Sequence, residues 1–393
     1  MYDERQVNDA VEAALESLDI TPAMFREAEG HYKAMASFLC NNGAESDISA
    51  FGSISTGTVT RPYSEDEGSY FDFDVLCRRS DLSKDGCEPD DVRRPIEEAL
   101  LGSDRYRDMT EACDECLTVE YVQNGKDGGF RLDLNPCVEN TGDEPEIAGC
   151  ETFPKYSSDT VSIARRNPDS WLGSNPQGLI DWFIDENERF AAISRESQRR
   201  EIFRKGAGVY ASVEEVPRNL ERSSLQRAIQ LAKRSRDVHY RNLPETVKRP
   251  PSCMLMVLIA RASESLPDDA SVLGIVRAFE AAMSEARTKA LAGHDTVVGF
   301  KGSWRVDNPV YGGSLIGDGW TDADMDAFFR WSGLIAGDLR ELALGGKRSR
   351  AAAEALFGKG DASAAALKML PEATKVAAPA AIVGGHKPWR SLT

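Results

Sequence analysis

Two aspartates stand one residue apart in a segment where apolar residues alternate with them, Phe71-Asp72-Phe73-Asp74-Val75. Successive side chains of a β-strand point to opposite faces, so Asp72 and Asp74 share one face and the apolar residues share the other. Two carboxylates a few ångströms apart repel each other unless a positive charge lies between them. Because divalent cations prefer such oxygen ligands, the segment predicts a strand that carries a metal site.

A Gly-Ser pair and a third aspartate lie near this strand in the chain. Gly52-Ser53 follows a short strand predicted over residues 47–51, and Asp133 stands between two leucines in an alternating strand over 130–135. Glycine lets the backbone approach oxygen atoms closely, so the Gly-Ser turn offers N–H groups and a hydroxyl to phosphates. This combination is typical of phosphoryl transfer, in which two metal ions brace the attacking and leaving oxygens.

We therefore assign the expected metal ligands as follows. Asp72 and Asp74 bind two divalent cations, Mg²⁺ or Mn²⁺, and Asp133 completes the site of the ion that activates the acceptor hydroxyl. Asp133 is also placed to accept the proton of that hydroxyl. The alternative is that Asp72 and Asp74 are solvated residues of an edge strand.

Composition limits the classes of partner. A net charge of −17 argues against an extended surface for nucleic acid, which needs clustered Lys and Arg. No apolar run approaches the roughly 20 residues of a membrane helix, and the start MYDERQVNDA has no secretory pattern, so we expect a cytoplasmic protein without a membrane contact. The eight cysteines are then expected to be mostly reduced thiols.

Length and pattern predict two lobes and a tail. A chain of 393 residues suggests about two to three domains. Up to residue 154, predicted helices alternate with predicted strands, with a loop over 61–70 and a short helix over 95–101; beyond Pro154 the pattern becomes helical. We expect an α+β catalytic lobe over 1–165 with a mixed, mostly antiparallel sheet, a helical lobe over 166–358, and a flexible tail over 359–393.

Charge is unevenly distributed between these lobes. Acidic residues crowd the segment 65–91, whereas basic residues crowd the segment 195–236. A substrate that carries both phosphates and a metal ion would suit an acidic lobe that faces a basic one. The basic segment is equally well explained as a solvated helix face.

Several longer motifs resemble a known family. They are GSISTGTVTRP leading into FDFDVL, RLDLNPCVE, WLGSNPQGLIDWF, SSLQRAIQLAKRSRDVHY and WRVDNP. Together they resemble the nucleotidyltransferases of the DNA polymerase beta type, and more closely the bacterial CD-NTases. These relatives of cyclic GMP-AMP synthase make cyclic oligonucleotide signals in CBASS anti-phage defence. The resemblance covers nearly all of positions 5–345.

The resemblance implies a reaction and further site residues. A ribose hydroxyl of one NTP would attack the α-phosphate of another, with ATP among the substrates, and repetition would close a cyclic di- or trinucleotide. Gly52 and Ser53 would contact the donor triphosphate, Lys233 would contact phosphates from the helical lobe, and Asn175 is a candidate for base choice. The tail is a candidate attachment segment for CBASS accessory proteins.

The sequence departs from the family in two places. The loop before Asp72 carries extra acid, Glu65-Asp66-Glu67, and the third aspartate is followed by Leu-Asn-Pro, which is polar one residue early. We interpret the second difference as variation that preserves the chemistry.

Other interpretations remain open. The chain could instead be a nucleotidyltransferase that modifies another acceptor, such as a small molecule or tRNA, although the net charge argues against a long RNA acceptor. It could also be a regulatory module that senses nucleotide without turnover. Cys113-x-x-Cys116 suggests zinc, but no second pair stands at ligand spacing, which favours reduced thiols.

Overall fold

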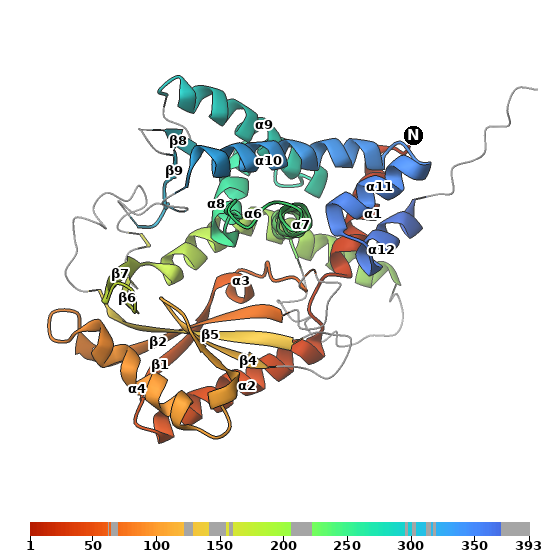
Figure 1. Ribbon diagram of the computed structural model, residues 1–393. Helices are drawn as coiled ribbons and strands as arrows, with labels where there is room; N and C mark the ends of the chain where they lie inside the picture. Colours follow the sequence, from red (N-terminus) through yellow and green to blue (C-terminus); the bar gives the residue numbers. More distant parts are fainter. Residues whose placement is uncertain are drawn as a thin grey trace, which may run out of the picture.

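A mixed β-sheet forms the centre of one lobe, and a group of helices forms the other (Figure 1). The computed structural model describes residues 1–61, 63, 70–121, 129–140, 155–156, 160–205, 222–294, 298–300, 304–311, 316 and 320–370. Of the predicted loop over 61–70, the acidic triplet 65–67 lies outside the described residues, and Tyr70 already belongs to a strand.

Within the described residues the sheet has seven strands, and its central pair is parallel. The strand order is β1-β2-β5-β4-β3, and β6 and β7 extend the sheet from β5. β2 and β5 run parallel, while every other described pair is antiparallel. The prediction of a mixed, mostly antiparallel sheet is therefore confirmed. The strands are β1 (Asp47–Phe51), β2 (Tyr70–Ser83), β3 (Thr110–Ala112), β4 (Leu117–Tyr121), β5 (Gly129–Glu139), β6 (Val161–Arg165) and β7 (Ser170–Ser174).

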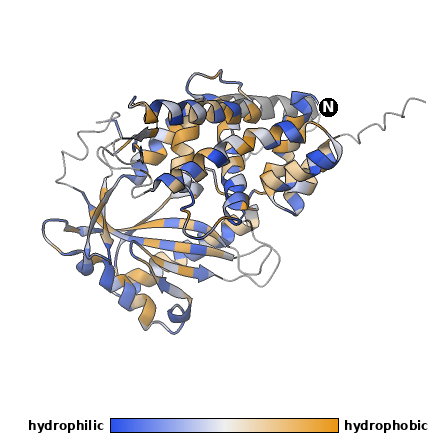
Figure 2. Ribbon diagram, turned by 45° about the horizontal axis from the view of Figure 1, so that its top comes forward, coloured by the Kyte–Doolittle hydropathy of each residue, from blue (hydrophilic) through white to orange (hydrophobic). Residues whose placement is uncertain are grey.

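One face of the sheet is apolar and packs against helices. Phe71, Phe73 and Val75 of β2 are buried there, as the alternation predicts. They pack in one core with α2 (Pro22–Asn41) and with part of α4 (Pro89–Gly102). Figure 2 shows the resulting alternation of hydrophobic and hydrophilic bands along the strands. The opposite face, which carries the aspartates, is turned toward the helical lobe (Figure 1).

The helical lobe is built around one large core. Its helix α7 is capped by the predicted Ser223–Gln226 box and α10 by the predicted Thr321–Asp324 box. Its elements are α6 (Pro176–Lys205), α7 (Ser224–Tyr240), α8 (Ser252–Ser263), α9 (Val272–Leu291), β8 (Val298–Phe300), β9 (Trp304–Val306), α10 (Asp322–Leu342), α11 (Gly346–Phe357) and α12 (Asp361–Met369).

The first and last described helices join this core, contrary to expectation. We expected α1 (Glu4–Glu16) in the catalytic lobe and a flexible tail from residue 359, but α1 packs against α12 (Figure 1). Small residues are buried on both helices, Ala10 and Ala14 on one and Ala362 and Ala366 on the other. Alanine favours the helix and leaves room for close approach, so this composition forms packed helices up to Leu370. Residues 371–393 lie outside the described part of the chain.

The sheet also continues beyond the point where the sequence suggested helix only. Strands β6 and β7 were not expected, because β6 is buried on both faces and so shows no alternation. Helix α4 likewise begins at Pro89 rather than Pro95, since Glu88 and Asp91 form a capping box around its first turn.

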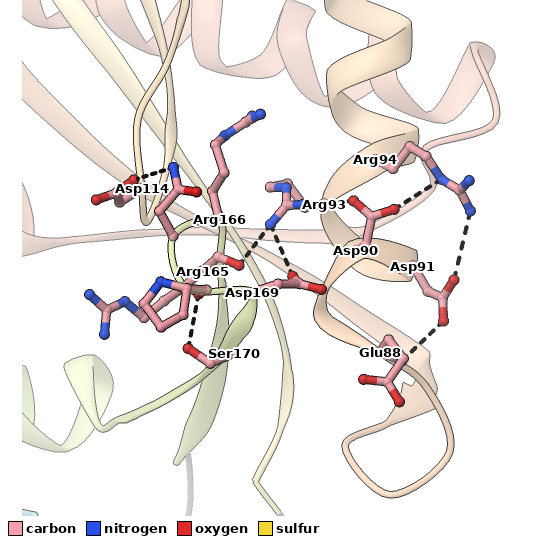
Figure 3. Close-up of polar contacts among 12 residues, drawn as sticks. Glu88, Asp90, Asp91, Arg93, Arg94, Asp114, Arg165, Arg166, Asp169 and Ser170 are labelled. Carbon is pink, nitrogen blue, oxygen red and sulfur yellow. Dashed lines mark hydrogen bonds and ion pairs between the residues drawn. The ribbon is translucent and has the colours of Figure 1, made fainter.

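A hydrogen bond fastens the end of β6 to α4, and an ion pair between Arg93 and Asp169 at 3.5 Å fastens the turn after β6 to the same helix (Figure 3). Arg93 of α4 donates to the carbonyl oxygen of Arg165 at 2.7 Å and pairs with Asp90 at 2.6 Å. The backbone N–H of Arg166 donates to the carbonyl oxygen of Asp114 at 2.7 Å. The turn after β6 is thus tied both to α4 and to the turn between β3 and β4.

No helix in the described part of the chain combines the length and the apolar character that a membrane crossing requires.

Candidate active site

The Gly-Ser pair begins a single helical turn that lies against β2, the strand of Asp72 and Asp74. β1 leads into the short helix α3 (Gly52–Ser55), and Gly52 has a φ of +70°, in the left-handed region. A Cβ atom at Gly52 would overlap the carboxylate of Asp74. Only glycine fits here, because the backbone lies directly against that carboxylate. The predicted close approach of backbone to oxygen is present, and the turn is the start of a helix.

The third aspartate lies beside the second one in the sheet. In the parallel pair β2–β5, Asp74 is opposite Asp133. In the antiparallel pair β4–β5, Thr118 is opposite Asp133, and its hydroxyl donates to the Asp133 carboxylate at 2.6 Å. The order across the sheet is therefore carboxylate, carboxylate, hydroxyl. Because β2 has a partner on each side, the interpretation of an edge strand is wrong.

A second polar row lies two residues away along the same three strands, before Asp74 and Asp133 on β2 and β5 and after Thr118 on the antiparallel β4. Asp72 is opposite Arg131 of β5, and Arg131 is opposite Glu120 of β4. Arg131 and Glu120 form an ion pair at 2.7 Å. Sequence reasoning missed Thr118, Glu120 and Arg131. Arg131 stands two residues before Asp133 and so shares its face, which was a visible signal.

Burial and like charge raise the pKa of the three carboxyl groups. The pKa of Asp74 is raised to about 7, first by burial and then by the negative charges of Asp133 and Asp72. Burial also raises the pKa of Asp72 and of Asp133, while the Thr118 hydrogen bond opposes the rise at Asp133. Asp72 is the most exposed of the three, although protein atoms surround much of its carboxyl group.

These residues suit a divalent cation by their chemistry. Within the described residues, no three His, Cys, Asp or Glu side chains come close enough together to form a finished metal site. Asp74 and Asp133 are nevertheless neighbours in register on one face, and their charges raise the pKa of Asp74. A cation would relieve this repulsion, so the donor set fits hard divalent ions.

Lys233 reaches the site from the helical lobe. Its ammonium group donates to the carbonyl oxygen of Thr58 at 3.0 Å, and its side chain is buried beside Asp72 and Asp74. Burial, followed by the charge of Arg236, lowers the pKa of Lys233 to about 8. An ammonium group has three donors, so Lys233 has donors beyond the one used by Thr58. Its contact with phosphate remains a prediction.

Other polar residues of α7 hold the segment 56–61, which we call the donor loop. Gln226 donates to the carbonyl oxygen of Thr56 at 2.8 Å, Gln230 to that of Val59 at 2.9 Å, and Arg234 to that of Arg61 at 2.6 Å. With Lys233, these side chains lie along one side of the helix at spacings of three or four residues. The row fixes the backbone that connects the Gly-Ser turn to the metal strand.

The basic residues of α7 are therefore not a solvated helix face. Arg227, Lys233, Arg234 and Arg236 are all at least nine-tenths buried. Gln230, which is fully buried, also donates to Asp19 at 3.0 Å, and Arg227 donates to the same carboxylate at 2.9 Å. For the basic residues that were expected between 195 and 218, the side chains lie outside the described part.

Asn175 is bound to protein backbone. Its amide donates to the carbonyl oxygens of Tyr156 at 2.5 Å and Val310 at 2.9 Å, and it accepts from the N–H of Gly178 at 2.9 Å. It lines the cleft at the start of α6. These bonds give Asn175 a role in shaping the wall, and direct base choice remains a prediction.

The predicted residues meet at a cavity between the lobes. The cavity has a volume of about 940 Å³, near the upper end of typical ligand pockets. Six of the seven predicted residues line it, namely Gly52, Ser53, Asp72, Asp74, Asn175 and Lys233. Asp133 is not among the lining residues but lies beside Asp74 on the neighbouring strand of the sheet.

The Cys113-x-x-Cys116 pair closes the turn between β3 and β4. Both are free thiols, and their sulfur atoms lie 3.9 and 3.7 Å from the hydroxyl of Thr118. Burial, and then the negative charge of Asp133, raises the pKa of Cys116 to about 12. The pair is thus part of the surroundings of Asp133.

A c-di-GMP synthase from Roseivirga ehrenbergii is 25% identical over 322 residues, covering 81% of this chain and 74% of the relative. A solved structure of the CD-NTase CdnG from Bradyrhizobium diazoefficiens, in complex with GTP, has a TM-score of 0.66 at 19% identity, covering 92% of this chain and 98% of that one.

The chain is thus similar in sequence to a cyclic-dinucleotide synthase and similar in fold to CD-NTases over most of its length. CdnC from E. coli MS115-1, in a complex with a HORMA protein, has a TM-score of 0.56 at 13% identity and covers 91% of this chain and 99% of that one. No family model matches the sequence. The α+β nucleotidyltransferase fold, expected from the motifs, is confirmed.

Proposed function

We propose that this protein is a CD-NTase that joins two NTP molecules, with release of pyrophosphate, and then closes the linear product into a cyclic dinucleotide. The observation that carries the proposal is that Asp74 lies against the Gly-Ser turn in the cleft and has Asp133 beside it in register on the neighbouring strand. The likeness to a curated c-di-GMP synthase supports it and makes GTP the first substrate to test. ATP, expected from the sequence, is the second.

The residues divide the work between the two ends of the cleft. Gly52 lets the backbone of α3 approach the donor triphosphate, and Ser53 adds its hydroxyl. Lys233 offers an ammonium group to the same phosphates from the helical lobe. Asp133, held by Thr118, orients the acceptor hydroxyl and accepts its proton.

Asp72, Asp74 and Asp133 would hold the divalent cations. Such ions, two of Mg²⁺ or Mn²⁺, supply Lewis-acid activation of the acceptor hydroxyl and neutralise the charge of the leaving pyrophosphate. A cation would bind the ionised form of Asp74, and without a cation the pKa of Asp74 is raised to about 7, so cation binding should strengthen as the pH rises. Activity should therefore increase as the pH rises through this value.

The biological setting is a further proposal. The resemblance suggests a role in CBASS anti-phage defence in the cytoplasm, with accessory proteins that act through the C-terminal residues 371–393. Truncation after Leu370 tests the last point, because it should remove any accessory interaction and leave NTP turnover intact. An unchanged set of interactions would contradict it.

The experiment for the reaction uses the purified chain with each NTP singly and in pairs, with Mg²⁺ or Mn²⁺. Pyrophosphate release and a phosphatase-resistant product are expected, and both should disappear in Asp133→Asn. Transfer of the nucleotide to an added tRNA or small molecule, without a cyclic product, would favour the alternative acceptors. Tight NTP binding without any pyrophosphate would favour a sensing module.

A further inference from the structure

Tyr70 and Arg131 lie side by side on the sheet face that carries the aspartates, at the end away from the Gly-Ser turn. Tyr70, Asp72 and Asp74 alternate along β2 and so share this face, as Arg131 and Asp133 do on β5. Tyr70 is opposite Gly129, and Arg131 is opposite Asp72. The carboxylates thus stand between the Gly-Ser turn at one end and the pair Tyr70 and Arg131 at the other.

The two side chains are held against each other. The guanidinium carbon of Arg131 lies 4.9 Å from the centre of the Tyr70 ring. A Cβ atom at Gly129 would lie 2.7 Å from the ring, so glycine leaves the space that Tyr70 occupies. Glu120 accepts from the Nε of Arg131 at 2.9 Å and pairs with its terminal nitrogen at 2.7 Å.

The pair faces the cleft and remains accessible. Both Tyr70 and Arg131 line the cavity, and 42% of the Arg131 side chain is exposed. Since Glu120 binds one edge of the guanidinium group, its plane stays fixed next to the ring. The structure therefore contains a preformed flat surface inside the substrate cleft.

We propose that Tyr70 and Arg131 form a stacking platform for the base of the acceptor nucleotide. This inference rests on the proposed function, and it assigns the site that binds the base of the acceptor nucleotide. The donor triphosphate belongs at Gly52, next to Asp74, so the acceptor must enter from the opposite end. Its hydroxyl lies at Asp133, and the platform is one strand repeat away, roughly 7 Å, which suits the reach from a ribose hydroxyl to its base.

The chemistry of the platform predicts its specificity. Aromatic rings and guanidinium planes stack on any base, and larger bases gain more contact. Because Glu120 occupies two donors of Arg131, the platform presents a plane rather than a free bidentate fork. We expect purine acceptors to be favoured over pyrimidines, with weak discrimination between guanine and adenine.

The test separates the two substrates. 2′,3′-Dideoxy-GTP has a triphosphate and no acceptor hydroxyl, so it serves only as donor, whereas GMP has hydroxyls and no triphosphate, so it serves only as acceptor. We expect Tyr70→Leu and Arg131→Gln to raise the KM for GMP roughly tenfold, the effect of losing one base stack. The KM for the donor should change less than twofold.

Conservative variants distinguish stacking from charge. Tyr70→Phe keeps the ring and should behave like the wild type, while Arg131→Lys keeps the charge, loses the plane and should be as impaired as Arg131→Gln. Arg79→Gln is the matched control, because Arg79 lies on the same strand outside the cavity and pairs with Asp81 at 2.7 Å. Full rescue by Arg131→Lys would overturn the platform in favour of a phosphate contact.

Two failures remain distinguishable. An unchanged KM for GMP in Tyr70→Leu, or an equal rise for donor and acceptor, overturns the platform and leaves the proposed function standing. Absence of any transfer by the wild-type protein overturns the proposed function. In that case GMP binding by calorimetry still tests the platform, which requires tenfold weaker binding in Tyr70→Leu and is overturned by equal affinity.

Discussion

Replacing Asp74 by asparagine should stabilise the protein while it removes the activity. Burial and the charges of Asp133 and Asp72 raise the pKa of Asp74 to about 7, from an ordinary value of 3.8. The ionised carboxylate is thus less favourable in the folded chain than in the unfolded chain. Asparagine has nearly the same shape and carries no charge, so it avoids this free-energy cost.

The sign and size of the effect follow from linkage. For an acid with a raised pKa, the stabilising contribution is complete below pH 3.8 and is lost as the pH rises through about 7. At about 1.4 kcal/mol per pKa unit, the ionisable carboxyl costs the folded state roughly 2 kcal/mol at pH 5 and roughly 4 kcal/mol at pH 8. The advantage of Asp74→Asn should therefore grow with pH.

Urea unfolding followed by tryptophan fluorescence measures this difference, at pH 5 and pH 8 with a chelator present. In a second series, with Mg²⁺ in place of the chelator, the wild type should become more stable and the variant should not, because Mg²⁺ binds only the folded, ionised site. Asp81→Asn is the control on the same strand: hydrogen bonds from Arg79 lower the pKa of Asp81, so that variant should lose stability. Equal stability of Asp74→Asn and wild type at pH 8 would refute the reasoning.

Three further substitutions test separate parts of the structure. Gly52→Ala places a Cβ atom against the carboxylate of Asp74 at a φ of +70°, so kcat should fall at least tenfold and the free energy of unfolding should fall by roughly 1–3 kcal/mol. Wild-type kinetics would contradict the close approach of the Gly52 backbone to Asp74. Gln230→Leu leaves the carbonyl oxygen of Val59 without its hydrogen-bond donor, so the free energy of unfolding in urea should fall by about 1–3 kcal/mol and the KM for NTP should rise. An unchanged KM would show that the donor loop needs no support from α7. Ala366→Leu overpacks the contact between α1 and α12, so the free energy of thermal unfolding should fall by about 1–3 kcal/mol while kcat stays unchanged below the melting temperature. An unaltered melting temperature would contradict the packing of α12 against α1.

The local part of the site could be read from the sequence. The alternation around Asp72 and Asp74 is a property of one strand, and the structure places that strand at the centre of the sheet. Asp133 could be assigned to a strand in the same way. Its place beside Asp74 depends on register between two segments more than fifty residues apart, which alternation alone does not encode.

Features that depend on distant partners were missed. The polar residues of α7 bind backbone carbonyl oxygens of the donor loop, and a carbonyl oxygen has no sequence signature. The sequence therefore did not distinguish Lys233 from a solvated lysine without the family resemblance. Alanine-rich composition similarly suggested a tail where α12 forms, because small residues become a packing surface only when α1 lies against them.

The most direct test of the central claim is the identity of the product. The purified protein is incubated with GTP, ATP or both in Mg²⁺, treated with phosphatase, and analysed by mass spectrometry for the wild type and for Asp133→Asn. A phosphatase-resistant cyclic dinucleotide that forms with the wild type and is absent with the variant is the predicted result. A product that persists in Asp133→Asn, or a wild-type protein that releases no pyrophosphate from any NTP pair, would contradict the assignment of this cleft as a nucleotidyl-transfer site.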